Sequence, residues 1–208
     1  MLEQIKVIKP SEIEKTSMEI ISEELGDRIF QKQEESVIKR CIHTSADFDY
    51  ADNLIFSENA VKDAIEAIRN GASIVTDTKM AASGINKKRL SQFGGQVYCF
   101  MDHEDVADEA KVRGCTRAVV CMERGIKIEG PVIFAIGNAP TALIHLYELI
   151  CEKKAEPVLV IGVPVGFVNV IESKELFIGS DIPHIIAKGR KGGSNIAAAI
   201  CNALLYQA

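Results

Sequence analysis

Five short apolar runs, separated by helical stretches, dominate the second two-thirds of the chain and constrain its fold more than any other feature. The runs are ASIVT (72–76), QVYCF (96–100), VIFAI (132–136), VLVIGV (158–163) and HIIA (184–187). Strands that are apolar on both faces are typical of a parallel sheet with helices on both sides. Right-handed crossovers between them predict a three-layer, doubly wound α/β domain with a five-stranded parallel sheet.

The remaining segments carry helical patterns, and residues 1–57 are mostly helical. An amphipathic helix that ends near Gly26 is predicted from the three- and four-residue spacings of Ile13, Ser17, Ile20, Ile21 and Leu25. Further helices are expected at 33–42, from an N-cap at Ser57 to Gly71, and near 87–93, 104–125, 141–154, 168–177 and 194–206. We interpret residues 1–208 as a single domain, in which the 1–57 extension packs on the 72–208 core.

Charge and hydropathy exclude several classes of partner. Lys and Arg number 24 against 29 Asp and Glu, which leaves a net charge of −5 without basic clusters. This balance disfavours binding to nucleic acid or to anionic membranes. The N-terminus lacks a signal-peptide pattern, and the longest apolar stretch (157–171) is shorter than the roughly 20 residues of a spanning helix. We therefore expect a cytoplasmic protein.

The loops after the five runs are the expected ligand site, because ligands bind beyond the carboxyl ends of parallel strands. These loops are rich in small residues, amides and hydroxyls. Two of them have a pattern that suits carboxylates or phosphates: Gly137–Pro140 leads directly into a helix, and Gly189–Asn195 adds cations and glycines before another. The candidate substrate-binding residues are Thr76, Asp77, Gly137, Asn138, Gly166, Asn169, Arg190, Lys191, Gly192, Gly193 and Ser194. The same loops could instead be the caps and turns that any α/β fold needs.

Common nucleotide, nucleophile and metal motifs are missing from the sequence. No G-x-G-x-x-G follows the first run, and neither G-x-x-x-x-G-K-[ST] nor G-x-S-x-G occurs. The six cysteines form no C-x-x-C pair, and the four histidines form no H-x-H or H-x-x-x-H pair. Hydride transfer, ATP hydrolysis and esterase chemistry are disfavoured, and we expect neither a cofactor nor a metal held by the protein.

His43 is the candidate catalytic residue. It precedes a polar segment that contains Asp47, Asp49 and Asp52. A histidine can donate or accept a proton near neutral pH, and neighbouring carboxylates can assist it. A lone histidine can equally be a structural hydrogen-bonding residue, so the local sequence leaves both roles open.

Five segments resemble the precorrin-8X methylmutases, including the cobalt-precorrin-8 methylmutases, of the corrin-ring pathway. They are IHTSADFDYADNLIFS (42–57), IVTDTKMAASGINK (74–87), FAIGNAPTAL (134–143), VIGVPVGFVNVIESKE (160–175) and GRKGGSNIAAAICNAL (189–204). They span nearly the whole chain in matching order.

The resemblance implies a flavodoxin-like fold and an isomerase that moves a methyl group from C11 to C12 of (cobalt-)precorrin-8. The product is cobyrinic or hydrogenobyrinic acid, and any cobalt belongs to the macrocycle. The family's acid/base falls on His43, and its substrate contacts map onto Ser17, Arg40 and Arg117. The resemblance also implies a homodimer with active sites near the subunit interface, and transient hand-over of product to neighbouring pathway enzymes.

Two other functions stay open from the sequence. One is a binding module for flavin or nucleotide in which His43 is structural. The other is a carrier that holds the corrinoid product without catalysis. The missing phosphate-binding motifs disfavour the first, and only turnover separates an enzyme from the second.

Overall fold

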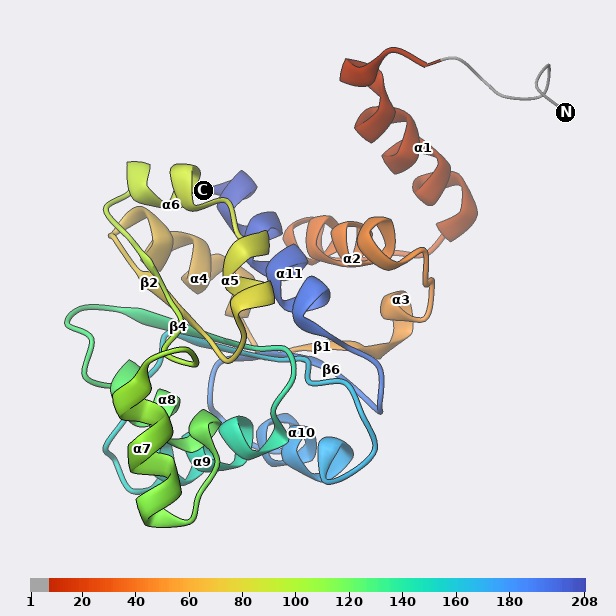
Figure 1. Ribbon diagram of the computed structural model, residues 1–208. Coiled ribbons are helices and arrows are strands. Elements are labelled where there is room, and N and C mark those ends of the chain that lie inside the picture. The colour runs from red at the N-terminus through yellow and green to blue at the C-terminus, as the bar shows by residue number, and fades with distance from the viewer. Residues whose placement is uncertain (1–7) are drawn as a thin grey trace, which may run out of the picture.

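The computed structural model describes residues 8–208 and contains a six-stranded sheet between two layers of helices (Figure 1). The strands are β1 (Leu54–Phe56), β2 (Ser73–Thr76), β3 (Val97–Tyr98), β4 (Val132–Ile136), β5 (Leu159–Gly162) and β6 (His184–Ala187). Their order in the sheet is β1-β6-β5-β4-β2-β3. Strands β2 to β6 are mutually parallel, and each lies within one of the five apolar runs.

The expectation of a purely parallel, five-stranded sheet is wrong, because β1 adds an antiparallel edge strand. Leu54 lies opposite Ala187, and Phe56 lies opposite Ile185. Three residues are too few to show a strand period, so the sequence pattern places this segment in the helical extension. If only the parallel strands are numbered, their order is 2-1-3-4-5, and the order reverses between β2 and β4.

Two hydrophobic cores lie on the two faces of the sheet, since successive side chains of a strand point to opposite faces. Ile74 and Ile133 face one core, whereas Val75 and Phe134 face the other. The first core is covered by α2 (Lys32–Ser45), α4 (Ala60–Arg69), α5 (Lys79–Gly84), α6 (Lys87–Gln92) and α11 (Ser194–Gln207). The second is covered by α7 (Glu104–Arg113), α8 (Arg117–Gly125), α9 (Pro140–Cys151) and α10 (Val170–Ile178).

The first helix stands apart from these layers. After a 3-10 turn (Pro10–Glu12), α1 (Ile13–Leu25) projects from the body and packs against α2 (Figure 1). It ends where predicted, because Gly26 takes a positive φ of 61° that terminates the helix. The rest of the extension, including the short helix α3 (Tyr50–Asn53), lies against the sheet and α11.

Several helices differ from those expected: α3 and α5 are additional, and two of the changed boundaries have a clear local cause. The segment 104–125 forms two helices, because Gly114 adopts φ of 64° and the hydroxyl of Thr116 then caps α8. Ser57 does not cap α4; its Oγ accepts a hydrogen bond from the N–H of His184, and α4 begins at Ala60. Within residues 8–208, every helix is too short or too polar to cross a membrane.

Candidate active site

His43 pairs with a serine from another helix. The imidazole is half-buried in the last turn of α2, and its Nδ1 lies 2.8 Å from the Oγ of Ser17 on α1. No residue between 8 and 208 bonds the other ring nitrogen, Nε2. A hydroxyl that holds one ring nitrogen fixes the orientation of the ring and leaves the other nitrogen for proton transfer.

The carboxylates expected around His43 are engaged elsewhere. Lys191 Nζ lies 2.7 Å from Asp47 Oδ2 and 2.5 Å from Asp49 Oδ2. Asp52 pairs with Arg28 at 2.7 Å. The ammonium of Lys191 therefore links the segment after α2 to the loop before α11, and its contact with a substrate carboxylate stays a prediction.

The Lys191 pair predicts a defined pH window of stability. The hydrogen bond from Lys191 lowers the pKa of Asp47 below its usual 3.8, and Asp47 and Asp49 raise the pKa of Lys191 above 10.5. The stabilisation is full above pH 3.8, is lost as pH falls through the lowered pKa of Asp47, and is lost again above the raised pKa of Lys191.

We expect the melting temperature (Tm) of Lys191→Met to lie below that of the wild type between about pH 4 and pH 10, and the gap to close in stronger acid. Thermal melts across pH measure this. Lys127→Met is the control, because Lys127 is exposed and forms no ion pair within the described residues. A gap that persists unchanged in acid would contradict the assignment.

The N–H groups at the start of α9 are bonded by a side chain of the protein itself. Asp77 Oδ1 accepts from the N–H of Gly137 at 2.8 Å, and Oδ2 accepts from Asn138 at 2.8 Å and Ala139 at 2.6 Å. Burial raises the pKa of Asp77, which is fully buried, and the three N–H groups oppose that rise. Its carboxylate therefore caps α9 where the strand order reverses, and a contact between Asp77 and substrate stays a prediction.

Thr76 is buried as well, and its contact with substrate stays a prediction. Its hydroxyl contacts the carbonyls of Thr78 at 3.0 Å and Tyr98 at 3.3 Å. Thr78 in turn bonds the buried hydroxyl of Ser194 at 2.7 Å. These side chains join the end of β2 to its neighbours and to the start of α11.

The loops after β4, β5 and β6 contact one another through backbone hydrogen bonds and close backbone approach. The N–H of Gly193 donates to the carbonyl of Val163 at 2.8 Å, and that of Gly166 donates to the carbonyl of Arg190 at 3.3 Å. A Cβ on Gly137 would lie 2.7 Å from the Cα of Ser194, so this approach requires glycine.

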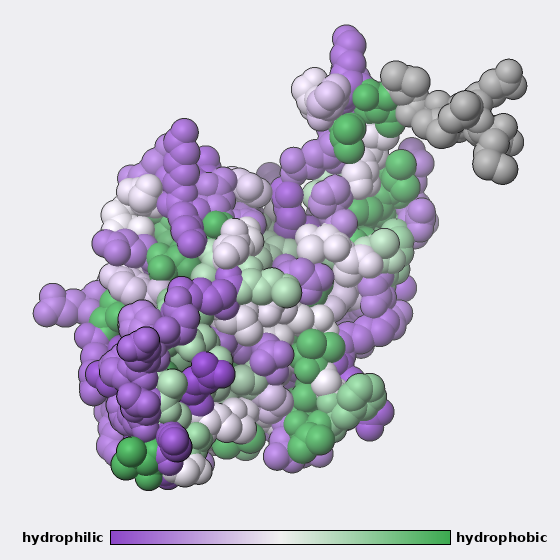
Figure 2. Space-filling view, viewed as in Figure 1, coloured by the Kyte–Doolittle hydropathy of each residue, from purple (hydrophilic) through white to green (hydrophobic). Residues whose placement is uncertain are grey.

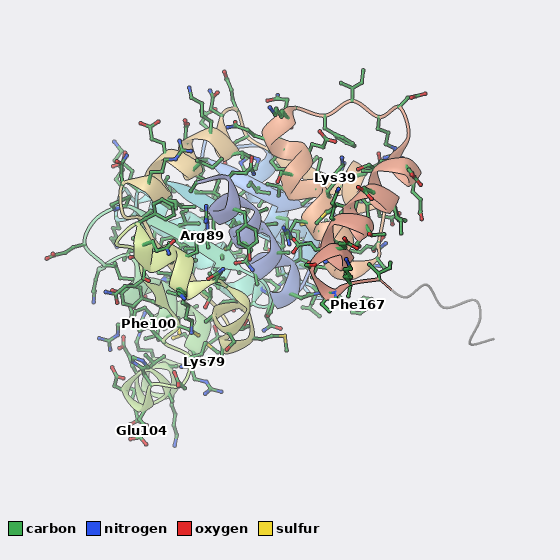
Figure 3. All side chains as sticks on the ribbon, turned by 90° about the horizontal axis from the view of Figure 1, so that it is seen from above. Lys39, Lys79, Arg89, Phe100, Glu104 and Phe167 are labelled. Atoms are coloured by element: carbon green, nitrogen blue, oxygen red, sulfur yellow. The ribbon has the colours of Figure 1, made fainter. Side chains whose placement is uncertain are left out.

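Exposed apolar and cationic side chains line the outer edge of these loops. The guanidinium of Arg190 lies 5.5 Å from the ring centroid of Phe167, which is 83% exposed beside the 78% exposed Val168. Figure 2 shows an apolar area over this part of the molecule, near the start of α10. At the other end of the edge, Lys79 pairs with Asp102 at 2.6 Å, and Figure 3 shows Lys79 beside Phe100, away from Phe167.

Arg40 lies one turn from the Ser17–His43 pair, since it precedes His43 by three residues on α2 and its partner Glu14 precedes Ser17 by three residues on α1. Arg40 pairs with Glu14 at 2.8 Å and lies 5.0 Å from the ring centroid of Tyr206. Arg117 is exposed at the start of α8 and contacts the carbonyl of Met101 at 3.4 Å. Asn138, Asn169 and Gly192 lie on the loops at the carboxyl edge.

Sequence reasoning missed Lys174. Its side chain is 1% exposed, and Nζ donates to the carbonyls of Gly189 and Lys191, both at 2.8 Å. The sequence did contain a signal, since Lys174 shares the buried stripe of α10 with Val170 and Phe177 at helical spacing. Among residues 8–208, no group of three histidine, cysteine or acidic side chains is arranged to hold a metal ion.

Similarity to known proteins extends over nearly the whole chain. The family model of precorrin-8X methylmutase matches residues 12–207. Cobalt-precorrin-8 methylmutase of Priestia megaterium is 44% identical over 95% of this chain and 88% of its own length. The protein of that name from Salmonella typhimurium is 44% identical over 95% of each chain.

A solved structure matches the fold as well. The crystal structure of precorrin-8X methylmutase from Thermus thermophilus is 38% identical, with a TM-score of 0.85, over 94% of this chain and 96% of that one. The matched segments include the strands, the loops at their carboxyl ends and the helices that carry Ser17 and His43. On these grounds the chain belongs to the precorrin-8X methylmutase family.

Proposed function

We propose that the chain moves a methyl group from C11 to C12 of precorrin-8 or its cobalt form, with His43 as the acid and base. Family membership makes it an isomerase, a methylmutase of cobalamin biosynthesis. The observation that carries the role of His43 is its geometry: Ser17 holds Nδ1 at 2.8 Å, and Nε2 has no partner within residues 8–208.

A methyl shift within one molecule needs no external nucleophile, so a single acid can promote it. When the imidazole of His43 is protonated, its Nδ1–H donates to the Ser17 hydroxyl, and Nε2 carries the proton that can be transferred, so that the transfer leaves a neutral ring. Transfer of a proton from His43 to the conjugated macrocycle makes the rearranging carbon framework more electron-poor. The methyl group then migrates, and the imidazole takes a proton back as the corrin ring forms.

The carboxyl edge of the sheet suits a large disc fringed with carboxylates. Five parallel strands spaced about 4.8 Å apart give an edge of about 19 Å. Phe167 and Val168 offer exposed apolar surface for the ring, and Arg190 offers a cation for a peripheral carboxylate. The strand order 2-1-3-4-5 supports a flavodoxin-like description of the parallel part of the sheet.

The protein acts as a homodimer in this proposal. Helix α1 projects from the body, and Ile13 and Ile20 on it are about half-exposed (53% and 47%). A groove of about 570 Å³ runs between α1 and α2, next to the elements that carry Ser17 and His43. A second copy would cover this surface, and sedimentation equilibrium measures whether it does. A cytoplasmic location and hand-over of product to neighbouring enzymes stay predictions.

Absorption spectroscopy tests the activity directly. Mixed with precorrin-8 or its cobalt form, the wild-type protein should convert the substrate to the corrin chromophore over many turnovers. A bound pigment that stays unconverted would instead identify a carrier. Absence of corrinoid binding together with binding of flavin or nucleotide would identify the other alternative.

A further inference from the structure

The geometry points to Lys174 as a positioning residue that orients the Gly189–Gly192 backbone for binding a substrate carboxylate. This inference rests on the proposed function. Lys174 lies in the middle of α10, and among residues 8–208 its ammonium contacts only two hydrogen-bond acceptors, the carbonyls of Gly189 and Lys191. No carboxylate of these residues pairs with it.

Because the peptide bond is planar, these two contacts also fix the directions of the N–H groups that follow the two carbonyls. In a trans peptide, the N–H of the next residue points opposite to the carbonyl. Since the carbonyls of Gly189 and Lys191 point inward to Lys174, the N–H groups of Arg190 and Gly192 point away from α10. Neither N–H has an acceptor within residues 8–208. Two outward N–H groups beside the Arg190 guanidinium can bind one carboxylate.

The surroundings prevent the loop from shifting as a whole. A Cβ on Gly192 would clash with the Val163 carbonyl, and the Gly193 N–H is bonded to that same carbonyl. Lys191 extends the other way to Asp47 and Asp49, four and six residues after His43. Orientation of the loop is thus coupled to the segment that follows the catalytic helix.

Burial of this lysine is hard to explain by stability alone. Burial lowers the pKa of Lys174 to about 8, so the folded protein holds the ammonium less favourably than water does. A methionine of similar length would fill the space without that penalty, and the two carbonyls lie on a loop whose neighbours are partly exposed. Loss of the amine should therefore affect ligand binding more than folding.

The test compares Lys174→Met, Lys174→Arg and the control Lys154→Met in the full chain. Lys154 is a matched control because it is an exposed lysine whose ion pair with Glu152 lies away from the carboxyl edge. Absorption titration measures the affinity for the corrinoid product, cobyrinic acid. Thermal melts measure Tm. Hydrogen exchange of the Gly193 N–H measures local opening of the backbone.

We expect Lys174→Met to weaken product binding at least about 10-fold and to speed exchange at Gly193, with Tm within about 4 °C of the wild type. Lys174→Arg, which keeps the donors, should recover part of the affinity, and Lys154→Met should match the wild type. In addition, Arg190→Gln should weaken binding less in the Lys174→Met background than in the wild type, because the two positions serve one carboxylate.

Three outcomes would overturn the inference. Unchanged product affinity in Lys174→Met, with the wild type binding normally, would remove the role of Lys174 and leave the proposed function standing. Loss of folding in both Lys174 variants, or additive effects with Arg190→Gln, would make Lys174 a stabilising residue only. A wild-type chain that binds no corrinoid would refute the proposed function, and this inference would fall with it.

Discussion

Replacing His43 with alanine should slow methyl migration at least about 100-fold while the corrinoid still binds. General acid–base catalysis contributes about 10²–10⁴-fold to a rate, so we expect kcat to fall by about that factor. Product affinity should stay within about threefold, because the imidazole contributes to proton transfer more than to holding the ring. Single-turnover conversion followed by absorption measures the rate, and titration with product measures the affinity.

Two further variants test whether the loss of activity in His43→Ala arises from the oriented imidazole of His43. Ser17→Ala removes the hydroxyl that holds Nδ1 at 2.8 Å, and we expect a loss of about 10-fold in kcat from misorientation of the ring. His103→Ala, at an exposed histidine before α7, should leave kcat unchanged. If His43→Ala turned over at the wild-type rate, the proton donor would have to be another group.

The largest effect on stability is expected for Asp77→Ala. Three buried or partly buried N–H groups at the start of α9 would lose their acceptor, at about 1 kcal/mol each or more. A loss of about 3 kcal/mol corresponds to a fall in Tm of about 6–12 °C for a chain of this size. Urea unfolding and thermal melts check both quantities.

Asp102→Ala is the matched control for Asp77. Asp102 also follows a strand at the carboxyl edge, but its carboxylate is exposed and pairs only with Lys79 within the described residues. Its removal should change Tm little, since exposed ion pairs contribute little. Asp77→Asn, which keeps one oxygen acceptor, should fall between the two. Equal melting of Asp77→Ala and wild type would show that solvent replaces the carboxylate.

The predictions for His43 and Asp77 distinguish a residue proposed for proton transfer from a residue that stabilises the fold. His43 and Ser17 come from α2 and α1, outside the parallel strands, whereas Asp77 holds the strand ends together from within. In the proposed mechanism, the N-terminal elements carry the acid and base, and the loops beyond the strands supply the surface for the ring. A variant that loosens α1 should impair kcat before it impairs the fold.

The sequence by itself determined the parallel strands β2 to β6, most helices and the position of His43. These features depend on neighbours in the chain: apolar runs of strand length, helical spacing of apolar residues, and residues such as Gly26 that end a helix. Resemblance to a known family then indicated the chemistry. Local patterns could not place β1, because three residues carry no period and the strand forms only beside β6.

Only the tertiary structure decided which polar groups meet. Asp77 bonds N–H groups about 60 residues away, and Lys191 pairs with Asp47, 144 residues away in sequence. The local sequence assigns the Lys191 ammonium and the N–H groups at the start of α9 to a ligand, because it shows no partner for them. Lys174 was missed for the converse reason, since the acceptors of its ammonium are backbone carbonyls that no side-chain pattern records. Sequence shows which donors and acceptors exist, but their pairing depends on how distant loops pack together.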